Sequence, residues 1–117
     1  SFNGAMRDNP GWKGVQLMIK VGVVTGTSPT MVVKLQGSSD TGTSWYDIPG
    51  ATTATLTATG DYSITVYPGI KEVAGVATTG TTAQVDAIIP KSWRAQYTIG
   101  GATPSFTITN ANYVYLP

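Results

Sequence analysis

Alternation of apolar and polar side chains is the main pattern along the chain, and it predicts β-strands. In residues 13–25 apolar side chains stand at every second position, and they are Val15, Leu17, Ile19, Val21 and Val23. A period of two places successive side chains on opposite faces of a strand. We therefore expect this strand to bury its odd-numbered face.

The same alternation recurs along the rest of the chain. Trp93 and Tyr97 share their parity with Ala95 and Ile99, so we expect both aromatic side chains in the core. Residues 70–80 have the least regular pattern. Strands after the first one are predicted at residues 31–36, 45–48, 51–59, 62–67, 83–89, 93–99 and 106–109.

Turn-forming residues separate these segments. Residues 25–30, Thr-Gly-Thr-Ser-Pro-Thr, predict a hairpin that pairs the first two strands with each other. Residues 100–104, Gly-Gly-Ala-Thr-Pro, predict a turn before the 106–109 strand. About eight short strands without a helical period indicate an all-β, single-domain antiparallel β-sandwich, and a jelly roll is the expected topology.

A chain of 117 residues is the length of one domain. We expect an N-terminal arm over residues 1–12 and the β-sandwich domain over residues 13–117. The arm is either a frayed terminus or a segment that reaches a neighbouring subunit. Neither a targeting segment nor a membrane span is expected from the sequence.

The composition narrows the possible chemistry. The chain has no Cys and no His, only 11% charged residues and a formal net charge of +1, whereas we count 19 Thr. Thiol nucleophiles, disulfides and the commonest general base are thereby excluded. A net charge of only +1 gives no electrostatic footprint for nucleic acid or an anionic membrane. We expect a protein that is not an enzyme and needs no cofactor.

The acidic residues offer one alternative, a metal site. Ser38, Ser39, Asp40 and Asp47 could supply oxygen ligands for Ca²⁺. Asp40 is a single acid within a polar loop, however, and a plain hairpin turn is the favoured interpretation. Most acids stand at turn-like positions, which disfavours a catalytic carboxylate pair; the six acids are Asp8, Asp40, Asp47, Asp61, Glu72 and Asp86.

The aromatic residues offer a second alternative, a platform for sugar rings. Tyr67, Tyr113 and Tyr115 are the candidates that we expect to be exposed, and one of Trp45 and Tyr46 should face inward. Exposed tyrosines are also favoured anchors at protein interfaces. Core or subunit-interface roles are favoured over a sugar site.

Two segments resemble small structural proteins of tailed-bacteriophage virions. Residues 32–48, Val-Val-Lys-Leu-Gln-Gly-Ser-Ser-Asp-Thr-Gly-Thr-Ser-Trp-Tyr-Asp-Ile, resemble a strand–loop–strand hairpin of that group that contains Ser-x-Asp-x-Gly-x-x-Trp. Residues 93–108 are similar to its penultimate strand, Gly-containing turn and final strand. The Ser-Asp-Gly-Trp type of loop also occurs in sugar-binding sandwich domains, so its specificity is moderate.

The resemblance implies a capsid decoration, or cement, protein on the outer surface of the phage head. Such a protein would bind the major capsid protein, stabilise the shell and self-associate, with a trimer favoured. The alternatives are a carbohydrate-binding or adhesin-like module on the virion surface and a tail or baseplate subunit. The residues that we expect at interfaces are Phe2, Met6, Arg7, Trp12, Tyr67 and Tyr115.

Overall fold

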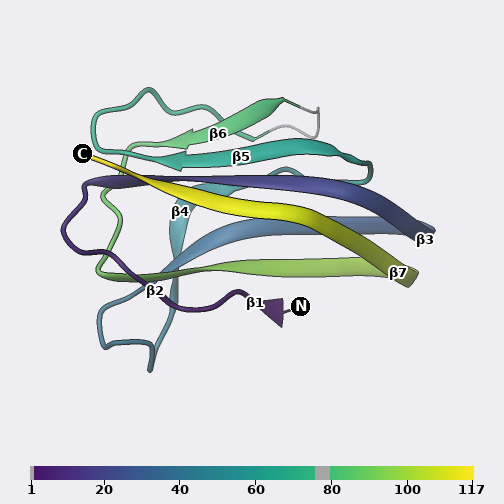
Figure 1. The fold of residues 1–117 in the computed structure, drawn as a ribbon, viewed down its shortest axis with the longest axis horizontal. Helices are drawn as coiled ribbons and strands as arrows, with labels where there is room; N and C mark the ends of the chain where they lie inside the picture. The colour runs from purple at the N-terminus through teal and green to yellow at the C-terminus, as the bar shows by residue number, and fades with distance from the viewer. Residues whose placement is uncertain (1, 76–79) are drawn as a thin grey trace.

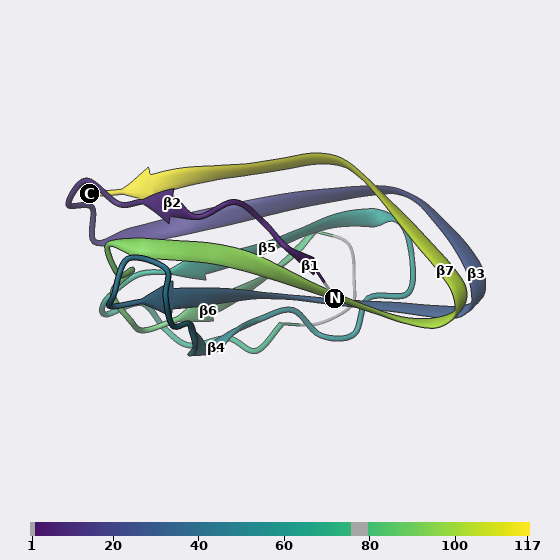
Figure 2. The same ribbon diagram turned by 90° about the horizontal axis from the view of Figure 1, so that it is seen from below.

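Two long antiparallel strands form the centre of the fold. The computed structural model describes residues 2–75 and 80–117. Strands β3 (Gly14–Ser38) and β7 (Ser92–Leu116) each have 25 residues, and they pair from Gly14↔Leu116 to Ser38↔Ser92. This ribbon bends sharply near its middle, at the right of Figure 2. Each long strand therefore contributes one half to each of two layers.

The shorter strands complete the two layers (Figures 1 and 2). In the first layer, β5 (Gly60–Val66) pairs antiparallel with the first half of β3, and β6 (Thr81–Val85) pairs parallel with β5. In the second layer, β4 (Tyr46–Thr52) pairs with the second half of β3. The outer side of β7 in that layer carries β1 (Phe2–Asn3) and β2 (Arg7–Asp8). The all-β prediction is thus confirmed, whereas jelly-roll connectivity stays a prediction.

The core lies between the two layers, and the predicted parity describes most of it. Met31, Val33 and Leu35 are fully buried on the second half of β3. Trp93, Ala95 and Tyr97 lie beside them on the paired strand β7 and are buried on the same face, as predicted. The other buried apolar residues are Val15, Leu17, Ile19, Val21, Ile48, Ala51, Leu56, Tyr62, Ile64, Val66, Ala83, Val85 and Ile89.

Val23 departs from the predicted parity, because its side chain is 50% exposed. The register between β3 and β7 shifts between Lys20 and Val21 and again between Val21 and Val23. An irregularity of this kind changes which face the following side chains occupy. Val24, rather than Val23, packs against the core.

The two predicted turns at 25–30 and 100–104 are bends within continuous strands. Residues 13–25 and 31–36 do not pair with each other, because each half of β3 pairs with the opposite half of β7. Likewise 93–99 and 106–109 are parts of one strand. The hairpin interpretation was therefore wrong, although the residues at which the chain changes direction were identified correctly. Of the irregular segment 70–80, residues 76–79 lie outside the described part.

Candidate interaction surface

The N-terminal segment lies along its own domain. Its backbone pairs Phe2 with Tyr97 in β1 and Arg7 with Trp93 in β2. Between these strands the Gly4 N–H donates to the carbonyl oxygen of Ala95 at 2.8 Å. Figure 2 shows this segment crossing the open side of the sandwich between the two layers. In the single chain, the predicted arm is thus an added edge of the second layer.

Asn9 fixes the end of that segment. Its side chain is nearly buried, and its Nδ2 donates to the carbonyl oxygens of Trp12 at 2.7 Å and Ile89 at 3.2 Å. Its Oδ1 accepts the N–H groups of Gly11 at 3.1 Å and Trp12 at 2.7 Å. The sequence signals a turn here through Asn-Pro-Gly, but it does not reveal that Asn9 binds a loop 80 residues away.

Trp12 projects from this turn with 43% of its surface exposed. A shallow hollow of about 540 Å³ adjoins it. The hollow is also lined by Asn9, Pro10, Gly11, Ile89 and Lys91. Trp12 is therefore a predicted interface residue that the structure places on the surface, with its backbone N–H and C=O both hydrogen-bonded to Asn9.

Two further exposed apolar side chains lie at the same end of the sandwich, which we call the loop end. This end holds residues 9–13, 39–45 and 86–91 and is opposite the bend of β3 and β7, at the left of Figure 1. Tyr46 is 48% exposed and Ile88 is 69% exposed. The sequence patterns did not identify Ile88, because they placed it within a predicted strand over residues 83–89, whereas β6 ends at Val85 and Ile88 lies in the loop that follows.

Met6 and Arg7, two other predicted interface residues, contact their own chain. Met6 is 43% exposed, and its sulfur lies so near Gly42 that a Cβ there would be 2.9 Å from it. The Arg7 guanidinium lies 5.2 Å from the centre of the Tyr113 ring, within cation–π distance. Burial raises the pKa of Tyr97, and the charge of Arg7 opposes this shift.

Tyr115 and Tyr113 are half-buried, contrary to the expectation that they are exposed. They form edge-to-face contacts with the buried Trp93, at centroid distances of 6.3 Å and 5.2 Å respectively. The Tyr115 hydroxyl accepts from Trp93 Nε1 at 3.2 Å and donates to the Asp8 carbonyl at 2.7 Å. These tyrosines therefore join β7 to the N-terminal segment instead of forming an open platform.

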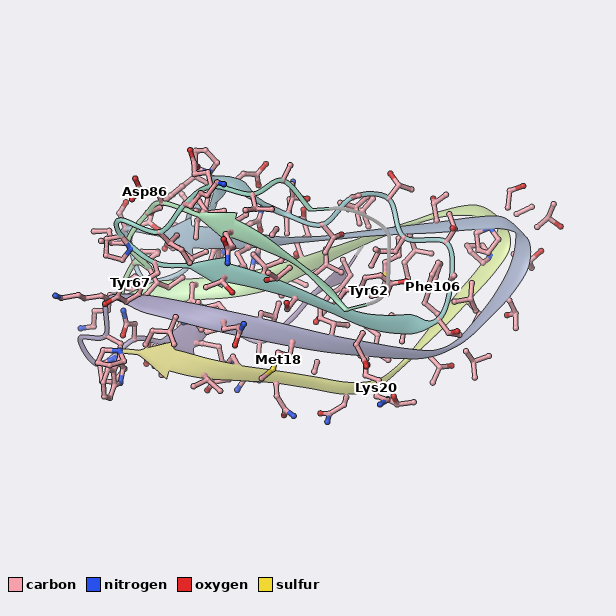
Figure 3. All side chains as sticks on the ribbon, turned by 90° about the horizontal axis from the view of Figure 1, so that it is seen from above. Met18, Lys20, Tyr62, Tyr67, Asp86 and Phe106 are labelled. Atoms are coloured by element: carbon pink, nitrogen blue, oxygen red, sulfur yellow. The ribbon has the colours of Figure 1, made fainter. Side chains whose placement is uncertain are left out.

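Tyr67 is also only partly exposed. Its hydroxyl donates a hydrogen bond of 2.7 Å to the carbonyl oxygen of Pro117. Figure 3 shows Tyr67 at the same end of the molecule as Asp86. Asp86 accepts the N–H of Gly69 at 2.7 Å, which closes the turn after β5.

The polar loop between β3 and β4 closes a hairpin, as predicted from its turn-forming residues. Oδ1 of Asp40 accepts hydrogen bonds of 2.8 Å from both the Ser38 hydroxyl and the Ser44 N–H. These bonds lower the pKa of Asp40, with the Ser44 backbone contributing most. Across residues 2–75 and 80–117, no group of three or more acidic side chains is arranged to hold a metal ion.

Trp45 is covered by a cation instead of being open to a sugar. The Arg94 guanidinium lies 4.1 Å from the centre of its ring. Arg94 also donates to Gln36 at 2.9 Å, and Gln36 donates to Asp47 at 2.9 Å. Asp47 accepts from Lys34 at 3.0 Å as well, and its pKa is lowered by Gln36 first and Lys34 second. This network occupies the outer face of the second layer.

Three comparisons with known proteins were made: with family models, with curated proteins and with solved structures. None of the three found a match. In the described part of the chain, no helix is long and apolar enough to cross a membrane.

Proposed function

We propose that this chain is a virion structural protein of a tailed phage, a decoration protein that binds the major capsid protein. It lies on the outer surface of the head, stabilises the shell and carries out no reaction. The sequence resemblance of residues 32–48 and 93–108 supports the virion assignment. The geometry of Trp12 supports a role in binding.

The exposed position of Trp12 is the main support for a binding role. Tryptophan is enriched among residues that dominate protein interfaces, because its large ring buries much surface with few rotatable bonds. The Asn9 hydrogen bonds hold both the N–H and the C=O of Trp12. An anchor held in place before binding loses less conformational entropy when its partner arrives.

The surroundings of Trp12 favour the loop end as the contacting surface. Tyr46 and Ile88 expose further apolar area at this end of the sandwich. Pro90 lies beside Tyr46, since a Cβ on Gly37 would approach both side chains within 2.8 Å. The core of a protein interface is typically rich in such aromatic and aliphatic groups.

The test is binding to head shells assembled from the major capsid protein encoded alongside this chain. We expect the wild-type chain to co-sediment with expanded shells and Trp12→Ala to weaken binding by at least about tenfold. Val23→Ala is the matched control, because Val23 is 50% exposed near the bend. Its binding should equal that of the wild type. Absence of the chain from purified virions, or failure to bind shells, would reject the proposal.

Carbohydrate binding is a second candidate, supported by the hollow beside Trp12. An exposed Trp12 ring with Lys91 nearby offers stacking and a polar contact to a sugar ring. A glycan array separates the two candidates. Binding to glycans that Trp12→Ala abolishes, with no binding to shells, would favour the carbohydrate-binding module.

A further inference from the structure

The second half of β7 borders the first layer, and one side of it lacks a strand partner. Residues Ser105–Val114, which we call the free edge, pair with β3 on one side. In the part of the chain that the structure describes, β7 otherwise pairs only with β1 and β2, near Tyr97 and Trp93. Figure 1 shows the olive-to-yellow half of β7 at the border of its layer.

The other borders of the two layers are covered or interrupted. The first half of β7 is covered by β1 and β2. Strand β4 contains Pro49, which has no N–H to donate. Beyond β6, Val73 forms a bridge to Gln84, with hydrogen bonds of 3.0 Å and 2.9 Å. Proteins commonly protect strand edges by such means, because unpaired N–H and C=O groups recruit other strands.

The free edge has none of the usual protective residues. After Arg94 the chain carries no charged side chain, and between Pro104 and Pro117 it contains no proline. Thr109, Asn110, Ala111 and Asn112 are all exposed. The register with β3 shifts at Thr109, so the regular part of this edge, Asn110–Val114, is the template for the addition of another strand.

A second copy of the chain matches this edge. Residues Asn110–Leu116 keep a regular register with β3, so the backbone there is a straight template. In an antiparallel pair about a two-fold axis at Asn112, Ala111 of one copy lies opposite Tyr113 of the other, a small residue facing a large one. Asn112 meets its own counterpart, and amide side chains satisfy each other's donors and acceptors. No like charges oppose each other along the neutral edge.

We propose that two copies of this chain associate through the free edges of β7, antiparallel and centred on Asn112. The first layer of one copy then continues into the first layer of the other, and the unpaired backbone groups become hydrogen-bonded. This pairing is two-fold, so it replaces the trimer that the resemblance implied. It does not depend on the proposed capsid role, which concerns the loop end.

The first test is sedimentation velocity of the whole chain over a range of concentrations. We expect a monomer–dimer equilibrium for the wild type. The pair of changes Asn110→Lys and Asn112→Lys should raise its dissociation constant by at least about tenfold, because like charges then lie opposite each other. The control adds the same charge in the β4–β5 connection, by Thr57→Lys and Thr59→Lys, and should dimerise as the wild type does. A monomer at all concentrations, a trimer, or a dimer unaffected by the lysines at 110 and 112 would overturn the proposal.

The second test does not rely on the folding of the charged variant. Because the chain has no Cys, a cysteine introduced at position 112 can form a disulfide only between two copies. Cross-strand Cβ atoms at about 4.5–5.5 Å lie close to the separation that a disulfide needs. Asn112→Cys should give a covalent dimer rapidly under mild oxidation, whereas Thr57→Cys should not. Equal rates for the two variants would reject the two-fold axis at Asn112. If this dimer forms but binds no shells, the capsid role fails independently.

Discussion

Gly26 and Gly101 occupy equivalent places at the bend of the β3–β7 ribbon. A Cβ on Gly26 would lie 2.7 Å from the carbonyl oxygen of Thr103, and a Cβ on Gly101 would lie 2.7 Å from that of Ser28. Both glycines have φ near +112°, and Ser28 and Thr103 have φ of 46° and 45°. Each bend has the sequence Gly-x-Ser/Thr-Pro. The two bends therefore have matching sequence and backbone conformation, and each glycine lies against the opposite bend.

Replacing Gly26 or Gly101 by alanine should destabilise the fold. The added methyl group meets a backbone oxygen that cannot rotate away, and positive φ is unfavourable for any residue with a Cβ. We expect a loss of about 2–4 kcal/mol in the free energy of unfolding for either variant, measured by urea denaturation. Gly69→Ala is the control, because Gly69 has φ of +84° but no heavy atom within 4 Å of its added Cβ. It should lose only about 1 kcal/mol, and an equal loss in all three variants would contradict the steric explanation.

Replacing Trp93 by alanine should lower the stability of the fold far more than replacing Trp12 does. Trp93 is 1% exposed and packs against Tyr113 and Tyr115, so Trp93→Ala should cost about 3–5 kcal/mol of stability. Trp12→Ala should change stability by about 1 kcal/mol or less, since much of its ring already contacts water. Denaturation curves of the two variants, measured under the same conditions, test this. A similar loss for both would mean that Trp12 is a core residue rather than a binding residue.

Asn9→Ala should lower the stability of the fold, because the hydrogen bonds of the Asn9 side chain are lost. The substitution leaves the N–H and C=O of Trp12 and the C=O of Ile89 without their side-chain partner. Loss of such bonds at a buried site costs about 1–3 kcal/mol. Asn3→Ala is the matched control, because its side chain makes an exposed bond to Gln96, and it should cost about 0.5 kcal/mol or less. Hydrogen exchange at the amide of Trp12 should accelerate only in the Asn9 variant; no acceleration would exclude a restraining role for Asn9.

Below about pH 8, the pH dependence of stability should be confined to the acid range. The folded-state pKa of Asp47 and of Asp40 is lowered, so the ionised carboxylates contribute stability above their unfolded pKa of about 4. That contribution is lost as pH falls through the lower, folded-state pKa. Without histidine, no side chain with an ordinary pKa titrates between about pH 5 and 8, and the free energy of unfolding should be flat there.

Asp47→Asn tests the acid part of this prediction. The variant should lose less stability than the wild type when the pH is lowered from 5 to about 3, because one of the two depressed carboxyl groups is gone. Urea denaturation at several pH values measures the difference. Identical acid profiles for the variant and the wild type would show that the bonds from Gln36 and Lys34 do not couple to folding.

The sequence predicted which side chains are buried better than it predicted which strands pair. Alternation is a local property, so Met31, Val33 and Leu35 could be assigned to the core from their spacing alone. Pairing of Gly14 with Leu116 depends on contacts across about 100 residues, which no local pattern encodes. The bend residues looked like turns because a positive φ followed by proline serves equally well in a tight turn and in a bent strand.

The candidate site was predicted in part. Trp12 was predicted as an interface residue of the N-terminal arm, and the structure places it on the surface. Tyr115 and Tyr113 were expected to be exposed, yet the N-terminal segment packs against both. The exposure of Ile88, the hydrogen bond from Asn9 to Ile89 and the free edge of β7 depend on tertiary arrangement, which local sequence patterns do not encode.

The long β3–β7 ribbon also sets the order of events during synthesis. When residues 14–38 leave the ribosome, the partner that pairs with all of β3 has not yet been made. Until residues 92–116 emerge, β3 exposes the apolar side chains of both layers, and only local contacts with β4 and β5 can form. Non-local pairing of this kind is slow to form because a long loop must close first. The nascent chain therefore passes through an aggregation-prone interval whose length is set by how quickly residues 39–116 are translated.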